Sequence, residues 1–306
     1  MENPKHYLAG VGAFVIWGFF SVPLRALKAF SAGEILYFRI LFSVLFLSII
    51  LFSFRKASLK KDWAYFRSMS GSKKWKVLGL TLAGGLLLTI NWLVFIYTVN
   101  YVNVKTASFS YLICPVMTAA LGYVIIKEKL EPLQWIAVGL CALSCALIGM
   151  SSFQELGYSV VTALSFALYL ISQRKNQEFD RLFVLGVQML FALLVLSFGI
   201  NHLVGHVPAS GLFYEIIILI AIGFTIIPLF LNLFALQQVN SATIGILMYI
   251  NPMLNFVLAF TLFDEQVDLT QLLGYVIIFI GLFLFNYQNI RKLQGKWVGV
   301  KRTTSH

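Results

Sequence analysis

Long hydrophobic runs, separated by short polar segments, recur along the whole chain. A helix that crosses a bilayer needs roughly 20 apolar residues to span about 30 Å of hydrocarbon. The runs are apolar on every face and lack the alternation of membrane β-strands, which indicates an all-α integral membrane protein. We predict ten membrane-spanning helices, near residues 7–25, 34–54, 77–99, 104–126, 133–151, 156–173, 182–203, 213–236, 241–263 and 269–288.

The stretch from Val102 to Gln134 recurs about 137 positions later in the chain. Such self-similarity predicts two copies of one unit, repeat 1 at about 7–151 and repeat 2 at about 156–288. Because each copy holds five helices, the second copy starts on the opposite side of the membrane, and we expect inverted repeats around a central cavity. The coinciding pairs are Val102/Val239, Asn103/Asn240, Thr106/Thr243, Ile113/Ile250, Pro115/Pro252, Leu121/Leu258, Glu128/Glu265 and Gln134/Gln271.

Composition agrees with a polytopic membrane protein. Hydrophobic residues make up 59% of the chain and charged residues 11%, at a mean hydropathy of +0.86, which excludes a soluble domain. The first run, from Tyr7 to Leu24, is longer than a typical signal-peptide core, so we interpret it as a helix that remains in the protein. No linker rich in proline or serine interrupts the chain. We therefore expect one transmembrane domain over 1–306, ending in a cytoplasmic basic tail at 289–306.

The net charge of +11 reflects orientation. Most of the 23 lysine and arginine residues fall in the segments that face one side if the N-terminus is cytoplasmic, and the positive-inside rule then places both termini in the cytoplasm. This charge faces the anionic leaflet, so we expect the bilayer and not nucleic acid as its partner. The polar segment from Phe54 to Lys76 carries Leu59, Trp63 and Phe66 at helical spacing. It is either a helix on the inner membrane surface or a solvated basic linker.

Several short motifs occur along the chain. They are Trp17-Gly18, Gly33-Glu34-Ile35-Leu36 followed by Arg39, Asn91-Trp92-Leu93-Val94-Phe95-Ile96, Ala107-Ser108 with Tyr111 and Pro115 leading to Glu128, Gln134-Trp135 with Ala137-Val138, Val239-Asn240-Ser241-Ala242-Thr243 and Tyr249-Ile250-Asn251-Pro252. In combination these motifs resemble the RarD-like branch of the EamA group, in the drug/metabolite transporter superfamily, over nearly the whole chain. The resemblance implies a cell-membrane permease of ten helices with a substrate cavity lined mainly by helices 1, 3, 4, 6, 8 and 9. The chain departs from the branch at Lys105, Ser110 and Cys114.

Polar residues recur at helical spacing on several of the predicted helices. In lipid, such groups face protein or water, so they line either a cavity or polar contacts between helices. Pro115 and Pro252 each lie within an uncharged run and free backbone carbonyls at membrane depth, where discontinuous helices of transporters bind cargo. The substrate-binding residues that we predict are Trp17, Arg39, Asn91, Tyr111, Pro115, Tyr169, Asn232, Tyr249, Asn251 and Pro252.

Ionisable residues are nearly absent from the centres of the runs. All 12 carboxylates and all 4 histidines lie near predicted helix ends or in loops, so no buried carboxylate is available for proton exchange. Arg39 is the exception, because it lies about five residues inside the second run. It either extends to the outer interface, with Glu34 as partner, or anchors an anionic or zwitterionic cargo.

The function most consistent with these features is secondary transport of small organic metabolites or drugs by alternating access, through export or exchange. Import or facilitated uptake remains open. A channel is disfavoured because no charged ring or carbonyl filter appears. An enzyme is disfavoured because no metalloprotease motif, carboxylate pair or phosphate loop appears. We expect no metal or cofactor, and a monomer or weak homodimer. The cysteines, all within predicted helices, are Cys114, Cys141 and Cys145.

Overall fold

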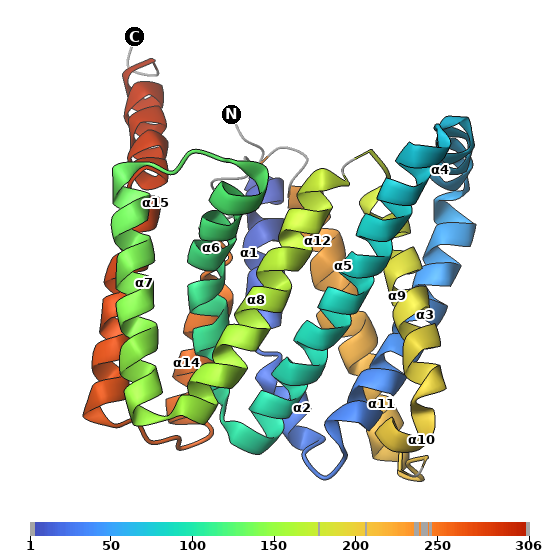
Figure 1. Cartoon of the computed structure of the whole chain (residues 1–306), viewed down its shortest axis with the longest axis horizontal. Coiled ribbons are helices and arrows are strands. Elements are labelled where there is room, and N and C mark those ends of the chain that lie inside the picture. Colours follow the sequence, from blue (N-terminus) through green and yellow to red (C-terminus); the bar gives the residue numbers. More distant parts are fainter. Residues whose placement is uncertain are drawn as a thin grey trace.

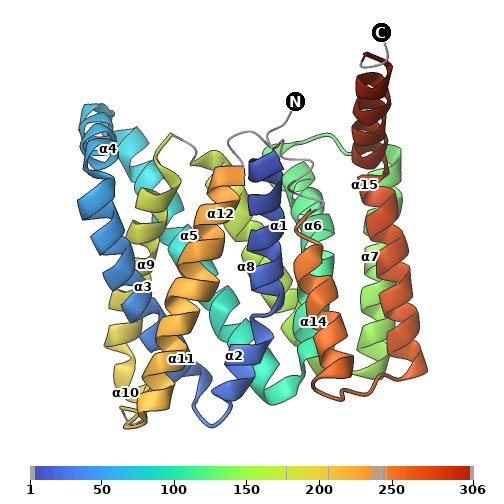
Figure 2. The same ribbon diagram turned by 180° about the vertical axis from the view of Figure 1, so that it is seen from behind.

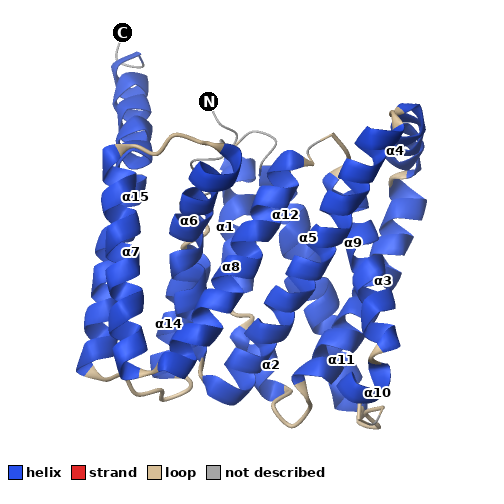
Figure 3. Ribbon diagram, viewed as in Figure 1, coloured by secondary structure: helices blue, strands red, loops and turns tan. Residues whose placement is uncertain are grey.

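The computed structural model describes residues 4–176, 178–205, 207–235, 239, 244 and 247–303, with backbone alone for 174, 233 and 288–303. Every regular element in these ranges is a helix, and the helices stand side by side with their ends at two opposite faces (Figures 1 and 3). Nine helices of the described chain are long and apolar enough to cross a membrane, and Ile250–Thr261 is a shorter apolar helix. The prediction of an all-α membrane protein is confirmed.

Five crossings make up the first half of the chain. The first is interrupted at residues 19–20, and the third ends in a π-helical turn. The third also starts earlier than predicted, since its lysine-rich first turns continue the helix beyond the apolar run. The elements are α1 (Pro4–Gly18) with α2 (Ser21–Ala26), α3 (Ala32–Phe54), α5 (Gly71–Tyr97) with η1 (Thr98–Val102), α6 (Val104–Ile126) and α7 (Pro132–Ser151).

The second half contains the remaining crossings. The eighth carries a π-helical turn in its interior, and the last helix continues through most of the predicted tail. The predicted helix over 241–263 is described from Ile250 onward, while most of its first part lies outside the described residues. The elements are α8 (Phe153–Lys175), α9 (Arg181–Phe198) with α10 (Ile200–Leu203), α11 (Gly211–Ala221) with η2 (Ile222–Ile226) and α12 (Ile227–Ala235), α14 (Ile250–Thr261) and α15 (Leu269–Thr303).

Side-chain caps set several helix starts. Ser31 and Glu34 form a reciprocal capping box at the start of α3, and Asn103 accepts the Thr106 N–H at the start of α6. The Asp180 carboxylate accepts the N–H groups of Leu182 and Phe183 at the start of α9. These caps satisfy backbone donors that have no partner within the helix, so they fix where each crossing begins.

Helix pairs relate the two halves by an approximate twofold axis. If each crossing is matched with the crossing five later, the pair α5 and α8 corresponds to α1 and α12, and the pair α5 and α9 corresponds to α3 and α11. In three further pairs the two helices are themselves five crossings apart, so the matching exchanges one with the other. These pairs are α3 with α9, α6 with α14, and α7 with α15. Because five crossings reverse the chain direction, the halves are inverted repeats.

The start of α1 and the end of α15 lie at the same end of the bundle, which we call the terminal end; the opposite end is the distal end (Figures 1 and 2). The segment that sequence left open forms α4 (Lys56–Ser68) at the terminal end. It is seen nearly end-on in both views, so it runs across the bundle. Its Trp63 side chain is exposed and stacks with Phe66, which favours the surface helix over a linker.

Candidate functional site

An arginine lies buried among the apolar helices of the bundle. Arg39, in the third turn of α3, is 3% exposed. Its guanidinium carbon lies 4.7 Å from the centre of the Phe20 ring and 4.3 Å from that of the Trp92 ring. Its Nε donates to Thr225 Oγ1 at 3.2 Å, and one of its two terminal nitrogens, Nη1, is buried without a hydrogen-bond partner among the described residues. Aromatic faces therefore hold a cation that keeps unused donors.

The alternative that Arg39 extends to the interface with Glu34 as partner is wrong. Glu34 instead caps α3, where its carboxylate accepts the Ser31 N–H at 2.9 Å. Across the described chain, no carboxylate forms an ion pair with Arg39. The side chain is buried, and its guanidinium lies over the rings of Phe20, from the break between α1 and α2, and Trp92 of α5.

Asn91 and Tyr111 meet near the centre of α5 and α6. The Tyr111 hydroxyl donates to Asn91 Oδ1 at 3.1 Å, and Asn91 Nδ2 donates to the Thr162 carbonyl of α8 at 2.8 Å. Asn91 has no exposed surface. The Tyr111 ring packs edge-on against Phe95 and Phe166. The structure thus brings these two predicted residues together, and their bonds tie three helices to one another.

Trp17 and Tyr169 lie on helices that flank this centre. Trp17 Nε1 donates to the Phe224 carbonyl of η2 at 3.0 Å, so this side chain links the first and eighth crossings. Tyr169 of α8 packs beside Phe166, at 5.8 Å between ring centres, against a cluster that includes Leu88 and Met189. Each is partly buried, with its ring against apolar neighbours.

The remaining predicted residues are distributed over other contacts. Pro115 lies within α6, and Pro252 is buried in the first turn of α14. Asn251 Oδ1 accepts a hydrogen bond from Asn255 at 2.8 Å, on the same helix. Asn232 of α12 has a buried amide oxygen without a partner among the described residues. These residues do not share contacts with Arg39.

Tyr249 and Tyr111 pack against different apolar clusters. Tyr249 contacts a cluster that includes Cys114 of α6, Cys141 of α7 and Leu282 of α15, whereas Tyr111 packs with Trp92 against another cluster.

Sequence reasoning missed Phe20 and Trp92 as neighbours of Arg39, and it missed Gln188 altogether. Gln188 is 1% exposed, and neither polar atom of its amide has a partner among the described residues. Its signal was present, because it is a polar residue in the middle of an apolar run, as Arg39 is. Ser43, one turn after Arg39 on α3, and Ser21, which follows Phe20, are also buried, and their hydroxyls have no partner among the described residues.

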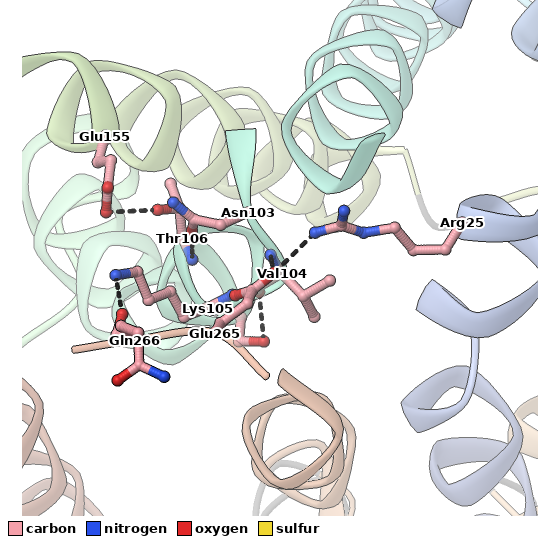
Figure 4. Close-up of polar contacts among 9 residues, drawn as sticks. Arg25, Asn103, Val104, Lys105, Thr106, Glu155, Glu265 and Gln266 are labelled. Atoms are coloured by element: carbon pink, nitrogen blue, oxygen red, sulfur yellow. Dashed lines mark hydrogen bonds and ion pairs between the residues drawn. The ribbon is translucent and has the colours of Figure 1, made fainter. Parts of the chain in front are cut away.

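A polar network joins the two halves at the distal end (Figure 4). The Glu265 carboxylate, in the segment between α14 and α15, accepts the Val104 and Lys105 N–H groups at the start of α6, at 2.6 and 2.9 Å. It also forms an ion pair with Arg25 of α2 at 2.7 Å. A carboxylate at a helix N-terminus is favoured by the helix dipole. Glu265 therefore joins three crossings at one point.

Lys105 and Glu155 extend this network. The Lys105 ammonium is buried and donates to the Gln266 carbonyl at 2.5 Å and to Gln271 Oε1 at 2.8 Å. Glu155, at the start of α8, accepts from the Thr106 hydroxyl at 2.8 Å and from the Gln271 amide at 3.3 Å. Thus Lys105 has a structural role in joining the halves.

Inverted five-crossing halves, a buried cation and polar side chains at mid-depth define a polytopic membrane transporter. The sequence profile of the EamA-like transporter family matches residues 4–150 and again 155–287, so the chain belongs to this family. The predicted resemblance to its RarD-like members is confirmed by their similarity in sequence.

Named relatives match nearly end to end. An uncharacterised transporter of Bacillus subtilis is 28% identical, over 95% of this chain and 96% of its own. The protein RarD of Streptomyces exfoliatus is 28% identical, over 95% and 90%, and that of Escherichia coli is 26% identical, over 93% and 94%. A crystal structure of a protein 13% identical superposes with a TM-score of 0.62, over 93% of this chain and 96% of its own, and shows the same fold.

Proposed function

We propose that this chain is a secondary transporter that exports or exchanges small organic anions or zwitterions by alternating access. The observation that supports this most directly is Arg39, a buried cation with unused donors and no carboxylate partner in the described chain. Burying an unpaired charge is costly, and intramembrane charges mark substrate pathways. A carboxylate or phosphate on the cargo would supply the missing counter-charge.

The surroundings of Arg39 favour a cargo with an apolar part. Phe20 and Trp92 cover the guanidinium, and Tyr111 lies near it with Phe95 and Phe166 against its ring. Aromatic walls with few polar groups are typical of sites for small organic ligands. The proposed binding region combines these residues with Trp17, Asn91 and Tyr169, while Asn232, Tyr249, Asn251 and Pro252 lie along its extension into the second half.

Irregular turns provide places where the crossings bend. The first crossing breaks between α1 and α2, the eighth carries the π-helical turn η2, and Pro115 interrupts hydrogen bonding within α6. Kinks in helices arise at such points, and π-helical turns are frequent at functional sites. Thr225, which binds Arg39, lies in η2. Bending there would therefore move a group that contacts the cargo site.

The bilayer and a small-molecule cargo are the partners that we propose, with a monomer or weak homodimer as the transporting unit. We place the terminal end in the cytoplasm, because the basic residues concentrate there. The chain is one membrane domain of two repeats, about 7–151 and 156–288, with its basic tail at 289–306 on the cytoplasmic side.

The test combines a ligand screen with cysteine accessibility. Purified protein is screened by thermal shift against panels of organic anions, zwitterions, neutral solutes and cations, and positive compounds are assayed for flux in liposomes. In a cysteine-free background, cysteines at positions 111 and 249 should react with a small polar thiol reagent and be protected by a transported compound. Cysteines at positions 142 and 281 on α7 and α15 should not react. Inert cysteines at both 111 and 249 in a protein that transports would place the cavity elsewhere.

A further inference from the structure

Gln188 is a buried polar group without a structural use. It lies on α9 with 1% of its surface exposed, and its amide oxygen and nitrogen both lack a hydrogen-bond partner among the described residues. An amide buried without partners costs free energy, and nearly all buried polar groups in folded proteins are paired. Methionine or leucine would fill the same volume without that cost, so the amide calls for an explanation.

A glycine lets this amide pack directly against the backbone of α5. A Cβ built on Gly84 of α5 would lie 2.6 Å from Gln188 Nε2, 3.0 Å from Ser172 Oγ and 3.1 Å from Gln173 Nε2. Three polar atoms, from α8 and α9, therefore lie against the backbone of α5 at Gly84, where any other residue would place its side chain. The Gln173 Nε2 atom is also buried without a partner in the described chain. We call Gly84, Ser172, Gln173 and Gln188 the amide cradle.

The amide cradle occupies the position that mirrors Arg39 across the twofold axis. Arg39 lies eight residues after the N-cap Ser31 of α3, and Gln188 lies eight residues after the N-cap Asp180 of α9. Arg39 contacts Thr225 of the eighth crossing, and Gln188 packs on Gly84 of the third. These helix pairs correspond under the symmetry of the fold. One half thus carries a cation and the other a neutral amide at equivalent places.

A polar stripe connects the two positions. On α5, Asn91 and Gly84 lie on the same face, seven residues apart, which is about 10 Å along a helix. On α8, Thr162, Ser165 and Ser172 follow at helical spacing, and Asn176, the C-cap of α8, donates to Thr81 of α5 at 2.9 Å. The stripe runs from the level of Asn91 toward the terminal end.

We propose that the amide cradle is a second binding position for the cargo, on the terminal side of Arg39. This rests on the proposed transport function. The cradle takes polar, hydrogen-bonding groups of the cargo, such as carboxylate, amino or hydroxyl groups, because amides both donate and accept. Since the cradle is neutral, it holds an anionic group more weakly than Arg39 does, and it offers hydrogen bonds to cargo that passes to or from the terminal side.

The first experiment asks whether the cradle is reached by a small anion. In a cysteine-free background, the Gln188→Cys variant is labelled with the sulfonate reagent 2-sulfonatoethyl methanethiosulfonate, added from the terminal side and from the distal side of membrane vesicles. The control is Ser144→Cys, since Ser144 is equally buried but bonds to the Gly274 carbonyl between α7 and α15. We expect the thiol at position 188 to react about tenfold faster than the thiol at position 144, and faster from the terminal side, because a minor open state exposes it.

The second experiment adds a methyl group at Gly84. Gly84→Ala places a methyl group against the end of the side chain at position 188, and when combined with Gln188→Cys it should lower the labelling of that thiol severalfold. The matched control, Gly79→Ala on the same helix, has no atom within 4 Å of its Cβ and should leave the labelling at position 188 unchanged.

The outcomes distinguish the cradle from the transport function. If the thiol at position 188 is as inert as that at position 144 while a cysteine at position 111 is labelled, the cradle is overturned and the central cavity stands. The cradle is likewise overturned if Gly84→Ala and Gly79→Ala leave the labelling at position 188 equal. If positions 111 and 188 are both inert, the proposed transport path fails with the cradle.

Discussion

Arg39 shows how a costly residue is retained in a hydrophobic bundle. Its guanidinium lies over the Phe20 and Trp92 rings, which favour a cation, but its Nη1 has no hydrogen-bond partner among the described residues. One neutral hydrogen bond, to Thr225, does not neutralise the charge. The proposed preference for anionic cargo rests on this positive charge, which has no counter-ion among the described residues.

Substitution of Arg39 tests directly whether its charge binds the cargo. Arg39→Lys keeps the charge but loses the planar fork, so it should retain part of the flux of an anionic compound identified by the screen. Arg39→Gln should lose most of that flux, by about tenfold or more, since hydrogen bonds to charged groups are worth about 1.5–3 kcal/mol. Liposome flux at equal protein level is the measurement. Normal flux in both variants would remove Arg39 from the site.

At the scale of single residues, sequence predicted which side chains are polar within the membrane but not what they contact. Arg39 was recognised because a charge in an apolar run is conspicuous. Its partners Phe20 and Trp92 were not, because aromatic residues are common in every run. The surroundings of Gln188 could not be predicted, because Gly84, against which its amide packs, is about one hundred residues away in the sequence.

At the scale of elements, α4 is held to the terminal end by the segment between α8 and α9. Asp180 forms an ion pair with Arg55 at 2.8 Å and accepts from the Ser58 hydroxyl at 3.1 Å. Its own N–H donates to the buried Asp62 of α4 at 2.9 Å. Hydrogen bonds from Lys73 and Tyr65 lower the pKa of the neighbouring Glu178 carboxyl. The sequence pattern of α4 predicted an amphipathic segment, but these partners come from distant parts of the chain.

Asp180→Ala should destabilise the protein, because it removes the N-cap of α9 together with the partners of Arg55 and Ser58. Loss of such a cap costs about 1 kcal/mol, which we expect to appear as a lower midpoint of thermal unfolding in detergent. Glu178→Gln is the control, since its pair with Lys73 is exposed and contributes little. Equal midpoints for the two variants would show that the Asp180 contacts do not hold α9 and α4.

The contacts of Glu265 join α2, the start of α6 and the segment between α14 and α15 at the distal end. Glu265→Gln removes the charge that joins Arg25 to the start of α6 and should loosen these contacts between the halves. We expect a cysteine at position 111 to be labelled severalfold faster from the distal side in this variant. Glu215→Gln, an exposed residue of α11, is the control. Unchanged labelling would show that the network supports the fold without restricting access.

At the scale of the whole molecule, the inverted halves were predictable from the repeat at Val102 to Gln134, because an odd number of crossings per copy leaves no other arrangement. The interruptions at α1–α2 and at η2 each precede a proline, Pro23 and Pro228, which cannot donate to the carbonyl four residues earlier, so the sequence does signal them. What the sequence does not show is the new partner of the carbonyl freed by Pro228, because Trp17 of the other half donates to the Phe224 carbonyl.

Proton coupling is a property of the whole transport cycle. The carboxylates of the described chain lie near helix ends, in connecting segments or on α4. With none at mid-depth, flux of a screened anion or zwitterion in liposomes should persist without a proton gradient. A strict requirement for a pH gradient, abolished by replacing one carboxylate, would show that this carboxylate serves the cycle.

Orientation in the membrane follows from combining charge with the fold. The structure places α4 and the segment between α8 and α9 at the terminal end, and the segments after α10 and around Glu265 at the distal end (Figure 1). Basic residues concentrate at the terminal end, so that end should be cytoplasmic. Reporter fusions after Arg67 and Arg181 should therefore read cytoplasmic, and fusions after Pro208 and Glu265 external. Because the fold fixes these four positions relative to one another, all four must reverse together if the orientation is wrong. A mixed pattern, such as an external signal after Arg67 with an external signal after Glu265, would contradict the inverted arrangement itself.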